Sequence, residues 1–154
     1  MSRANTILIE GTQLIFRNLS GKPSDYNRNG SRVTGVVIPP EMVNDLVNDG
    51  WRVKELPPRD PADQPLYYMN VKCRFDNFPP KVYLVTQKKK TQLDEETIDQ
   101  LDYSEIESVD IEISPYEYEI TANNRGRAAY IKVMYVKVIE DAFAEKYSFG
   151  DVED

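Results

Sequence analysis

The sequence predicts a mainly β fold of a single domain, and a small antiparallel Greek-key barrel is the favoured architecture. Three observations lead to this prediction. The chain has 154 residues, which is the size of one compact unit. About seven short apolar or alternating segments recur along it, separated by Gly, Pro, Asn and Ser. A helical segment is inserted among them midway, without the regular strand-helix alternation of a parallel sheet.

Strands are predicted where β-branched residues gather or where apolar and polar residues alternate. In chain order these segments are Thr6–Arg17, Arg32–Ile38, Trp51–Leu56, Leu66–Phe75, Lys81–Thr86, Val109–Ile113, Tyr116–Ile120 and Ala128–Ile139. Gly11, in the middle of the first segment, indicates a bulge or a bend. The alternation in Leu66–Phe75 places Tyr68, Lys72 and Arg74 on one face, opposite an apolar face.

Prolines, glycines and acidic residues mark the helices and loops between these strands. Pro39 and Pro40 open a short helix over Glu41–Asn48, which ends at Gly50. Acidic residues in the first turn predict a second short helix over Asp94–Leu101. Loops or turns are predicted at Asn18–Ser31, Pro57–Pro65, Gln87–Thr91 and Asn123–Arg127. We expect residues 1–139 to form the domain and residues 140–154, which show no periodicity, to form an acidic C-terminal tail.

Charge is distributed unevenly along the chain, whose formal net charge is -7. Residues 1–90 hold 14 basic and 9 acidic side chains, whereas residues 91–120 hold 11 acidic and no basic ones. Residues 121–139 hold four basic and no acidic side chains, and residues 140–154 hold six acidic side chains and Lys146. This segregation predicts either a basic groove that an acidic tail covers or ordinary solvated faces followed by a disordered tail.

The composition argues against most catalytic chemistry. The chain has no histidine, which removes Ser-His-Asp and Cys-His nucleophiles and most zinc sites. Cys73 lies in an alternating apolar pattern and is interpreted as a core residue in a reducing compartment. The glycines match no phosphate-binding loop, and we predict no cofactor and no metal. No segment has the apolar length of a signal peptide or membrane span, so a soluble, intracellular protein is expected.

Basic and aromatic side chains alternate on the predicted strands and loops. A protein that binds single-stranded DNA (ssDNA) needs cations along the phosphates and flat rings for the bases, each stacked base contributing about 1–3 kcal/mol. The ten tyrosines suit this task because their hydroxyl edge tolerates water. We therefore predict an ssDNA site formed by Arg17, Lys22, Tyr26, Arg28, Arg32, Tyr68, Lys72, Arg74, Arg125, Arg127 and Tyr130.

The sequence also resembles the OB-fold single-stranded DNA-binding proteins of bacteriophages, particularly phages of actinobacteria. The resembling stretches are Phe16–Gly30, Val36–Leu56, Phe75–Thr86, Thr91–Asp102, Val109–Ile120 and Arg127–Val136. The resemblance implies a five-stranded OB barrel with additions, which coats ssDNA during DNA replication or recombination in the cytoplasm of the infected host. It also implies a tail that recruits partner proteins, here through Phe149, Asp151, Glu153 and Asp154. In the best-known tail pattern a hydrophobic residue follows the acids, whereas here Phe149 precedes them.

Two other functions remain open at this stage, and so does a homo-oligomeric state. One is a non-enzymatic phage protein-interaction or structural module, whose acidic helix and tail contact a basic partner. The other is a metal-dependent nuclease or hydrolase built on the carboxylates at residues 94–96 and at Asp110 and Glu112. The spacing of these carboxylates matches no metal-binding motif, so solvated carboxylates are the favoured interpretation.

Overall fold

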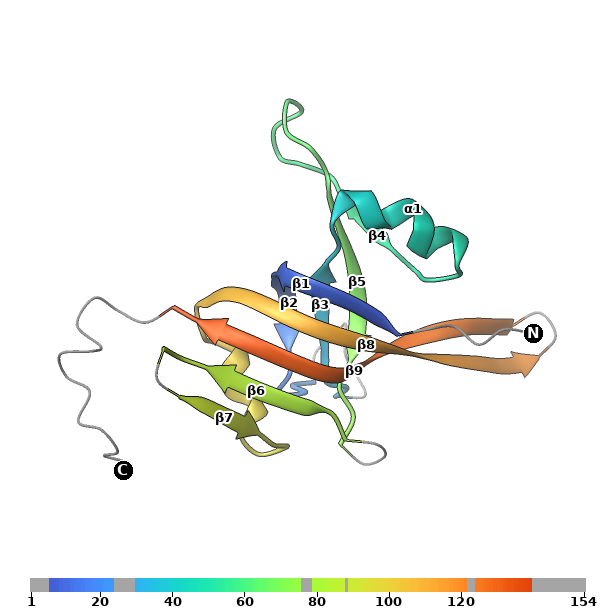
Figure 1. Ribbon diagram of the computed structural model, residues 1–154. Coiled ribbons are helices and arrows are strands. Elements are labelled where there is room, and N and C mark those ends of the chain that lie inside the picture. Colours follow the sequence, from blue (N-terminus) through green and yellow to red (C-terminus); the bar gives the residue numbers. More distant parts are fainter. Residues whose placement is uncertain (1–5, 24–29, 76–78, 88, 122–123, 140–154) are drawn as a thin grey trace.

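The structure, a computed structural model, describes residues 6–23, 30–75, 79–87, 89–121 and 124–139 (Figure 1). Its strands are β1 (Ile7–Thr12), β2 (Leu14–Asn18), β3 (Val33–Val37), β4 (Lys54–Leu56), β5 (Leu66–Lys72), β6 (Lys81–Val85), β7 (Lys90–Leu93), β8 (Ile106–Thr121) and β9 (Asn124–Val138). Its helices are α1 (Pro40–Asn48) and the 3-10 helix η1 (Ile98–Asp102). The prediction of a mainly β fold with one inserted short helix is confirmed.

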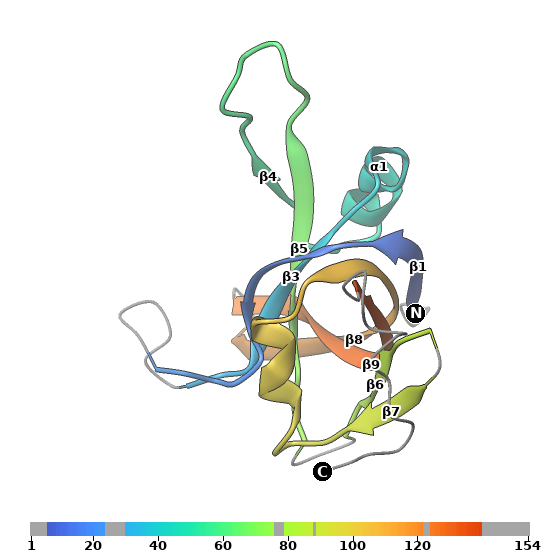
Figure 2. The same ribbon diagram turned by 90° about the vertical axis from the view of Figure 1, so that its left-hand side faces the viewer.

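The strands form one sheet in the order β1-β8-β9-β5-β3-β2, with β4 beside β5, and with β6 and β7 beyond β9. The two ends of this order, β1 and β2, are halves of one chain segment with only Gln13 between them. The sheet therefore curls round on itself, as the view in Figure 2 shows, into an OB-like, partly open barrel. The predicted antiparallel pairing holds except along one edge of β9, where β5 and β6 both run parallel to it.

The bend that joins β1 to β2 lies where the sequence predicts it. Gly11 adopts a φ of 67°, and the pairing of β1 with β8 changes register between Ile9 and Thr12. A positive φ suits glycine because it has no Cβ. The Thr12 hydroxyl donates a hydrogen bond to the carbonyl of Val37 on β3, which holds the bent segment against the other side of the barrel.

The hydrophobic core fills the barrel with alternate residues of the strands. On β8 these are Val109, Ile111 and Ile113; on β9, the buried side chains include Ile131, Met134 and Val136. The wider step from residue 131 to 134 reflects a bulge, because Glu112 pairs with Val133 and Ile113 with Ile131. The extra residue, Lys132, points outward and has an exposed side chain.

Helix α1 begins at Pro40 and ends at Asn48, close to the predicted bounds, and Gly50 comes after its C-cap residue Asp49. Gly50 has a φ of 100°, which favours glycine after the C-cap of a helix. A Cβ at this position would lie 3.3 Å from a guanidinium nitrogen of Arg127. The residues that follow α1 therefore pack closely against the Arg127 side chain of β9. Neither helix among the described residues is long and apolar enough to span a membrane.

Strand β8 is continuous, although Pro115 predicts a break between two shorter strands. Strand β1 pairs with β8 between Val109 and Ile113, so Pro115 lies where β9 is the only described neighbour. A proline is tolerated there because it has no N–H to donate and no second neighbouring strand needs that hydrogen bond. Past this point β8 and β9 project from the barrel as a two-stranded hairpin (Figure 1). Strand β9 starts at Asn124, so most of the predicted turn over Asn123–Arg127 is strand.

Three other segments differ from their predictions. The predicted basic turn Gln87–Thr91 contains the first residues of β7, because Thr86 and Lys89 close a hairpin with β6 through a 2.8 Å hydrogen bond. The predicted helix over Asp94–Leu101 is the later 3-10 helix η1, because the Asp94 carboxylate accepts the N–H groups of residues 96 and 97 and forms a turn first. The strand predicted over Trp51–Leu56 is reduced to β4.

Candidate nucleic-acid interface

A groove of about 310 Å³ lies where β5 and β9 separate. The two strands pair at Lys72 and Tyr130, and beyond this point β5 continues along β3 and β4 while β9 continues along β8 into the projecting hairpin (Figure 1). We call this space the hairpin groove. Its lining residues are Val33, Trp51, Arg52, Lys54, Met69, Asn70, Lys72, Tyr116, Arg127, Ala128, Ala129 and Tyr130.

Three cations on one wall of the hairpin groove are exposed to solvent. Lys72 is on β5, where the strand alternation turns it away from the core, and Lys54 is on β4, paired with Tyr68. Arg52 precedes β4 and is also exposed. Within the described part of the chain, none of the three forms an ion pair. This wall can therefore bind phosphate groups without first losing another partner.

Two tyrosines stand at the other side of the hairpin groove. Tyr116 on β8 is 58% exposed, and its ring meets that of Tyr130 on β9 edge to face, with 6.0 Å between the centroids. Both rings also line a second hollow of about 640 Å³, whose cationic residues are Arg74, Lys81 and Lys132. We call it the β9 hollow. The tyrosine pair thus separates two basic spaces and offers flat surfaces to both.

A further aromatic pair lies on the outer surface of β2, β3 and β5. Phe16 is 60% exposed and meets Tyr68 edge to face, with 5.4 Å between the centroids. Gly35 on β3 makes room for this arrangement, because a Cβ there would lie 3.3 Å from the Tyr68 ring. Phe16 has a φ of 51°, which is rare for a residue other than glycine and often occurs at functional sites.

Arg17 and Arg32, both predicted to bind ssDNA, make contacts within the fold. The Arg17 guanidinium donates hydrogen bonds of 2.7 Å to the carbonyls of Leu101 and Ser104, which ties β2 to the end of η1. Arg32 donates to the carbonyl of Leu19 at 2.8 Å and lies 5.7 Å from the centre of the Phe75 ring. These contacts give both side chains a structural role.

Arg127, another predicted cation, has extensive contacts within the fold. It binds the Glu117 carboxylate at 2.7 Å and the carbonyl of Asp49 after α1, and its guanidinium lies 5.1 Å from the centre of the Trp51 ring. Its side chain is 11% exposed. Arg127 thus connects the end of α1 to the hairpin and also lines the hairpin groove.

Lys22 is exposed, and its ammonium donates a hydrogen bond to the hydroxyl of Tyr103, just after η1. This hydrogen bond raises the pKa of Lys22 above its usual value. Tyr26, Arg28, the side chain of Arg125 and the tail residues Phe149, Asp151, Glu153 and Asp154 lie outside the described residues.

Of the predicted ssDNA-binding residues, the structure brings Lys72, Arg74, Arg127 and Tyr130 to the two hollows, with Tyr68 on the adjoining surface. The sequence-based prediction missed Phe16, Arg52, Lys54, Lys81, Tyr116 and Lys132. Alternation in WRVKEL could have identified Arg52 and Lys54, because it places them opposite Trp51 and Val53. No comparable sequence pattern identifies Tyr116 or Lys132 as site residues, because the position of each depends on the long β8–β9 pairing.

Cys73, Asp110 and Glu112 are buried or have partners within the fold. Cys73 is buried, and burial raises the pKa of its thiol to about 12. The Asp110 carboxylate accepts the Gly11 N–H at 2.8 Å, and Glu112 pairs with Lys132 at 3.4 Å. Among the residues that the structure describes, no three acidic or cysteine side chains gather into a group that could hold a metal ion.

Comparison with known proteins places these features in a family. The family model described as "Putative phage ssDNA-binding domain" matches residues 1–152. The chain is similar to the solved single-stranded DNA-binding protein from bacteriophage Enc34, with a TM-score of 0.53, 10% identity and coverage of 96% of this chain and 87% of that chain. It is also similar to the same phage protein in complex with ssDNA, with a TM-score of 0.54, 11% identity and coverage of 90% of this chain and 89% of that chain. No curated protein matches in sequence.

Proposed function

The chain belongs to the phage ssDNA-binding domain family, and on this premise we propose that it coats ssDNA without sequence preference during phage DNA replication or recombination. This membership agrees with the resemblance seen in the sequence. We propose that the protein acts without catalysis, in the cytoplasm of the infected host.

The observation that carries this proposal is the combination of free cations and exposed rings in the hairpin groove. Arg52, Lys54 and Lys72 bind the phosphates of a strand in the groove, and their charges are independent of base sequence. Bases stack on Tyr116 and Tyr130, which favour no particular base because every base has a flat face. Binding of this kind requires unpaired bases, so it favours single strands over duplexes.

A direct test compares fluorescence anisotropy for a labelled dT oligonucleotide, a mixed-sequence single strand and a duplex of equal length, each at two salt concentrations. We expect similar affinities for the two single strands and a weaker one for the duplex. The logarithm of the affinity should fall with the logarithm of salt concentration with a slope of about 0.7 per phosphate contact. Equal affinity for the duplex, or no binding to dT, would contradict the proposal.

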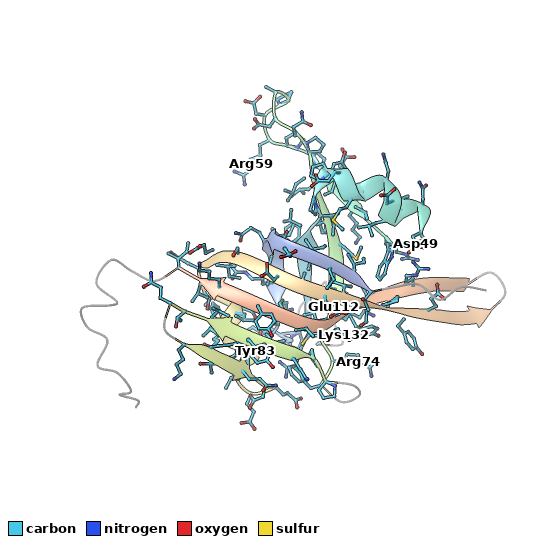
Figure 3. All side chains as sticks on the ribbon, in the orientation of Figure 1. Asp49, Arg59, Arg74, Tyr83, Glu112 and Lys132 are labelled. Carbon is cyan, nitrogen blue, oxygen red and sulfur yellow. The ribbon has the colours of Figure 1, made fainter. Side chains whose placement is uncertain are left out.

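The groove itself is tested by charge removal at matched positions. In the double variant Lys54→Gln/Lys72→Gln, we expect weaker ssDNA binding and a shallower salt slope, because two phosphate contacts are lost. The control is Arg59→Gln, which removes an exposed cation from the loop between β4 and β5, far from Arg74 and Lys132 in Figure 3. An effect per removed charge that is equal in both proteins would mean that only net charge matters.

For the C-terminal segment, we propose that residues 140–154 form an acidic tail on the ssDNA-binding domain of residues 1–139 and recruit replication or recombination proteins. Truncation after Ile139 changes the formal net charge from -7 to -2, because it removes six acidic side chains and one lysine. A tethered polyanion competes with ssDNA for a basic groove at high effective concentration. We expect truncation to tighten ssDNA binding several-fold at low salt and less at about 0.15 M, where charges are screened.

A further inference from the structure

The outer surface of β6, β7 and β9 carries a second aromatic and basic cluster, away from the hairpin groove. Tyr83 on β6 pairs in register with Tyr135 on β9, and their rings stack with 4.8 Å between centroids and 16° between planes. Lys90 on β7 lies 5.0 Å from the centre of the Tyr83 ring and 5.7 Å from that of Tyr135. We call these three residues the tyrosine platform.

The tyrosine platform continues the surface of the β9 hollow. Lys81 pairs with Val133, and both residues line the hollow. Tyr83 and Tyr135 are the residues two positions further along the same strands, so they lie on the same face of the sheet. Figure 3 shows Arg74, Lys132 and Tyr83 on the side that faces the viewer. A surface therefore runs from the Tyr116–Tyr130 pair, through the β9 hollow, to the tyrosine platform.

Charge along this surface favours a polyanion. Lys81 is exposed and, within the described residues, forms no ion pair, while Lys90 contacts the rings and leaves its charge unneutralised. Acidic residues lie on the neighbouring strands β1 and β8, where Glu10, Asp110 and Glu112 line a pocket that Tyr135 borders from its other edge. A negatively charged strand is therefore attracted to β6 and β7 and repelled from β1 and β8.

We propose that ssDNA leaving the hairpin groove crosses the β9 hollow and stacks a base on the tyrosine platform. This inference rests on the proposed function, because it extends the same binding site. Tyr135 lies five positions after Tyr130 on β9, which corresponds to about 16 Å at the usual strand rise. Stacked nucleotides advance by about 3.4 Å each, so the extension adds up to about five nucleotides, and fewer when the strand is stretched.

The experiment measures how affinity depends on oligonucleotide length. A series of dT oligonucleotides from about 4 to 20 nucleotides brackets the site size of one OB fold. We expect Tyr135→Ala and Tyr83→Ala to leave the affinity for the shortest bound oligonucleotides unchanged. With longer ones, each variant should lose about 5- to 150-fold, the effect of one lost base stack. The length at which affinity stops rising should decrease by about two to five nucleotides.

Three further variants separate stacking from folding and from net charge. Tyr135→Phe keeps the ring and should bind long oligonucleotides as the unchanged protein does. Lys90→Gln keeps both rings and should lower the salt slope with long oligonucleotides only. Arg59→Gln, which removes an equal charge elsewhere, should do neither. Melting temperatures measured beside the affinities identify any variant whose loss comes from unfolding.

The failure of this inference can be distinguished from failure of the proposed function. If the unchanged protein binds no dT oligonucleotide, the proposed function is wrong, and this inference falls with it. If folded Tyr135→Ala and Lys90→Gln variants show the unchanged affinity and site size, only the extension is wrong. If these variants alter sedimentation of the free protein but not the site size, the tyrosine platform pairs copies of the chain, and the proposal is likewise overturned.

Discussion

Lys72 and Arg127 line the same hairpin groove, but their surroundings differ. Lys72 is exposed and forms no ion pair in the described part of the chain. Arg127 is 11% exposed and binds Glu117, the carbonyl of Asp49 and the face of Trp51. The difference teaches that a cation in a binding groove can either bind the ligand or build the groove. Sequence position does not distinguish these roles, whereas the contacts do.

The chemistry of the two side chains explains this division. A guanidinium holds five N–H donors in a rigid plane, so one arginine can bind several carbonyls and carboxylates and still cover an aromatic ring. Arg17 and Arg32 also use this geometry to bind backbone carbonyls. A lysine ammonium is strongly hydrated on a flexible chain and suits an exposed phosphate contact. Lys54 and Lys72 have this environment.

The largest expected effect comes from removing Arg127. Arg127→Ala should lower the free energy of unfolding by about 1–3 kcal/mol, because it leaves the contacts between α1 and the hairpin without their central donor. The partners Asp49 and Glu117 are each 57% exposed, so water compensates part of the loss. Urea denaturation measures this change. The matched variant Lys72→Ala should unfold as the unchanged protein does, and an equal loss there would contradict the comparison.

Removing a ring from the groove should affect binding rather than folding. Tyr130→Ala should weaken ssDNA binding by about 1–3 kcal/mol through the loss of one stacking surface, with little change in salt slope. Anisotropy titrations at several salt concentrations measure both quantities. Tyr130→Phe keeps the ring and serves as the control. If Tyr130→Phe loses as much affinity as Tyr130→Ala, the hydroxyl and not stacking is responsible.

A smaller effect distinguishes the two kinds of cation directly. Lys72→Gln should reduce the salt slope by about 0.7, since one phosphate contact is lost, and should leave the melting temperature unchanged. Arg17→Gln should lower the melting temperature and leave the salt slope unchanged, because its guanidinium binds the carbonyls of Leu101 and Ser104. The salt slope and the melting temperature of both variants test this reciprocal result. A lower slope in Arg17→Gln would move Arg17 into the binding set.

The sequence predicts much of this fold because its strongest patterns are local. Alternation in β5 separates buried Met69 from exposed Lys72, and Gly11 marks the bend between β1 and β2. The continuity of β8 through Pro115 was not predictable locally, because it depends on which side of the strand lacks a neighbour. For the site, the residue types were predicted better than their roles. The sequence predicts that Arg127 is a phosphate ligand. In the fold, its guanidinium binds the carbonyl of Asp49, which is 78 positions away in the chain.

The smallest expected effect concerns Lys22, whose environment is intermediate between the two sets. It is exposed like Lys72, yet the hydroxyl of Tyr103 accepts a hydrogen bond from its ammonium and raises the pKa of Lys22. A raised pKa in the folded state contributes stability below the unfolded value of about 10.4, and this contribution is lost as pH rises through the folded value. Stability below pH 10 should therefore not vary with pH on account of this contact.

Tyr103→Phe removes the hydroxyl and keeps the ring, whose centre is 5.2 Å from the Lys22 ammonium. We expect the pKa of Lys22, measured by NMR titration of its side chain, to fall. The melting temperature at neutral pH should fall only slightly, because the contribution of this contact is present there but water screens the exposed Lys22 ammonium. A loss of stability as large as that of Arg127→Ala would instead show that Lys22 builds the fold. An unchanged pKa would mean that the hydroxyl does not hold the ammonium in solution.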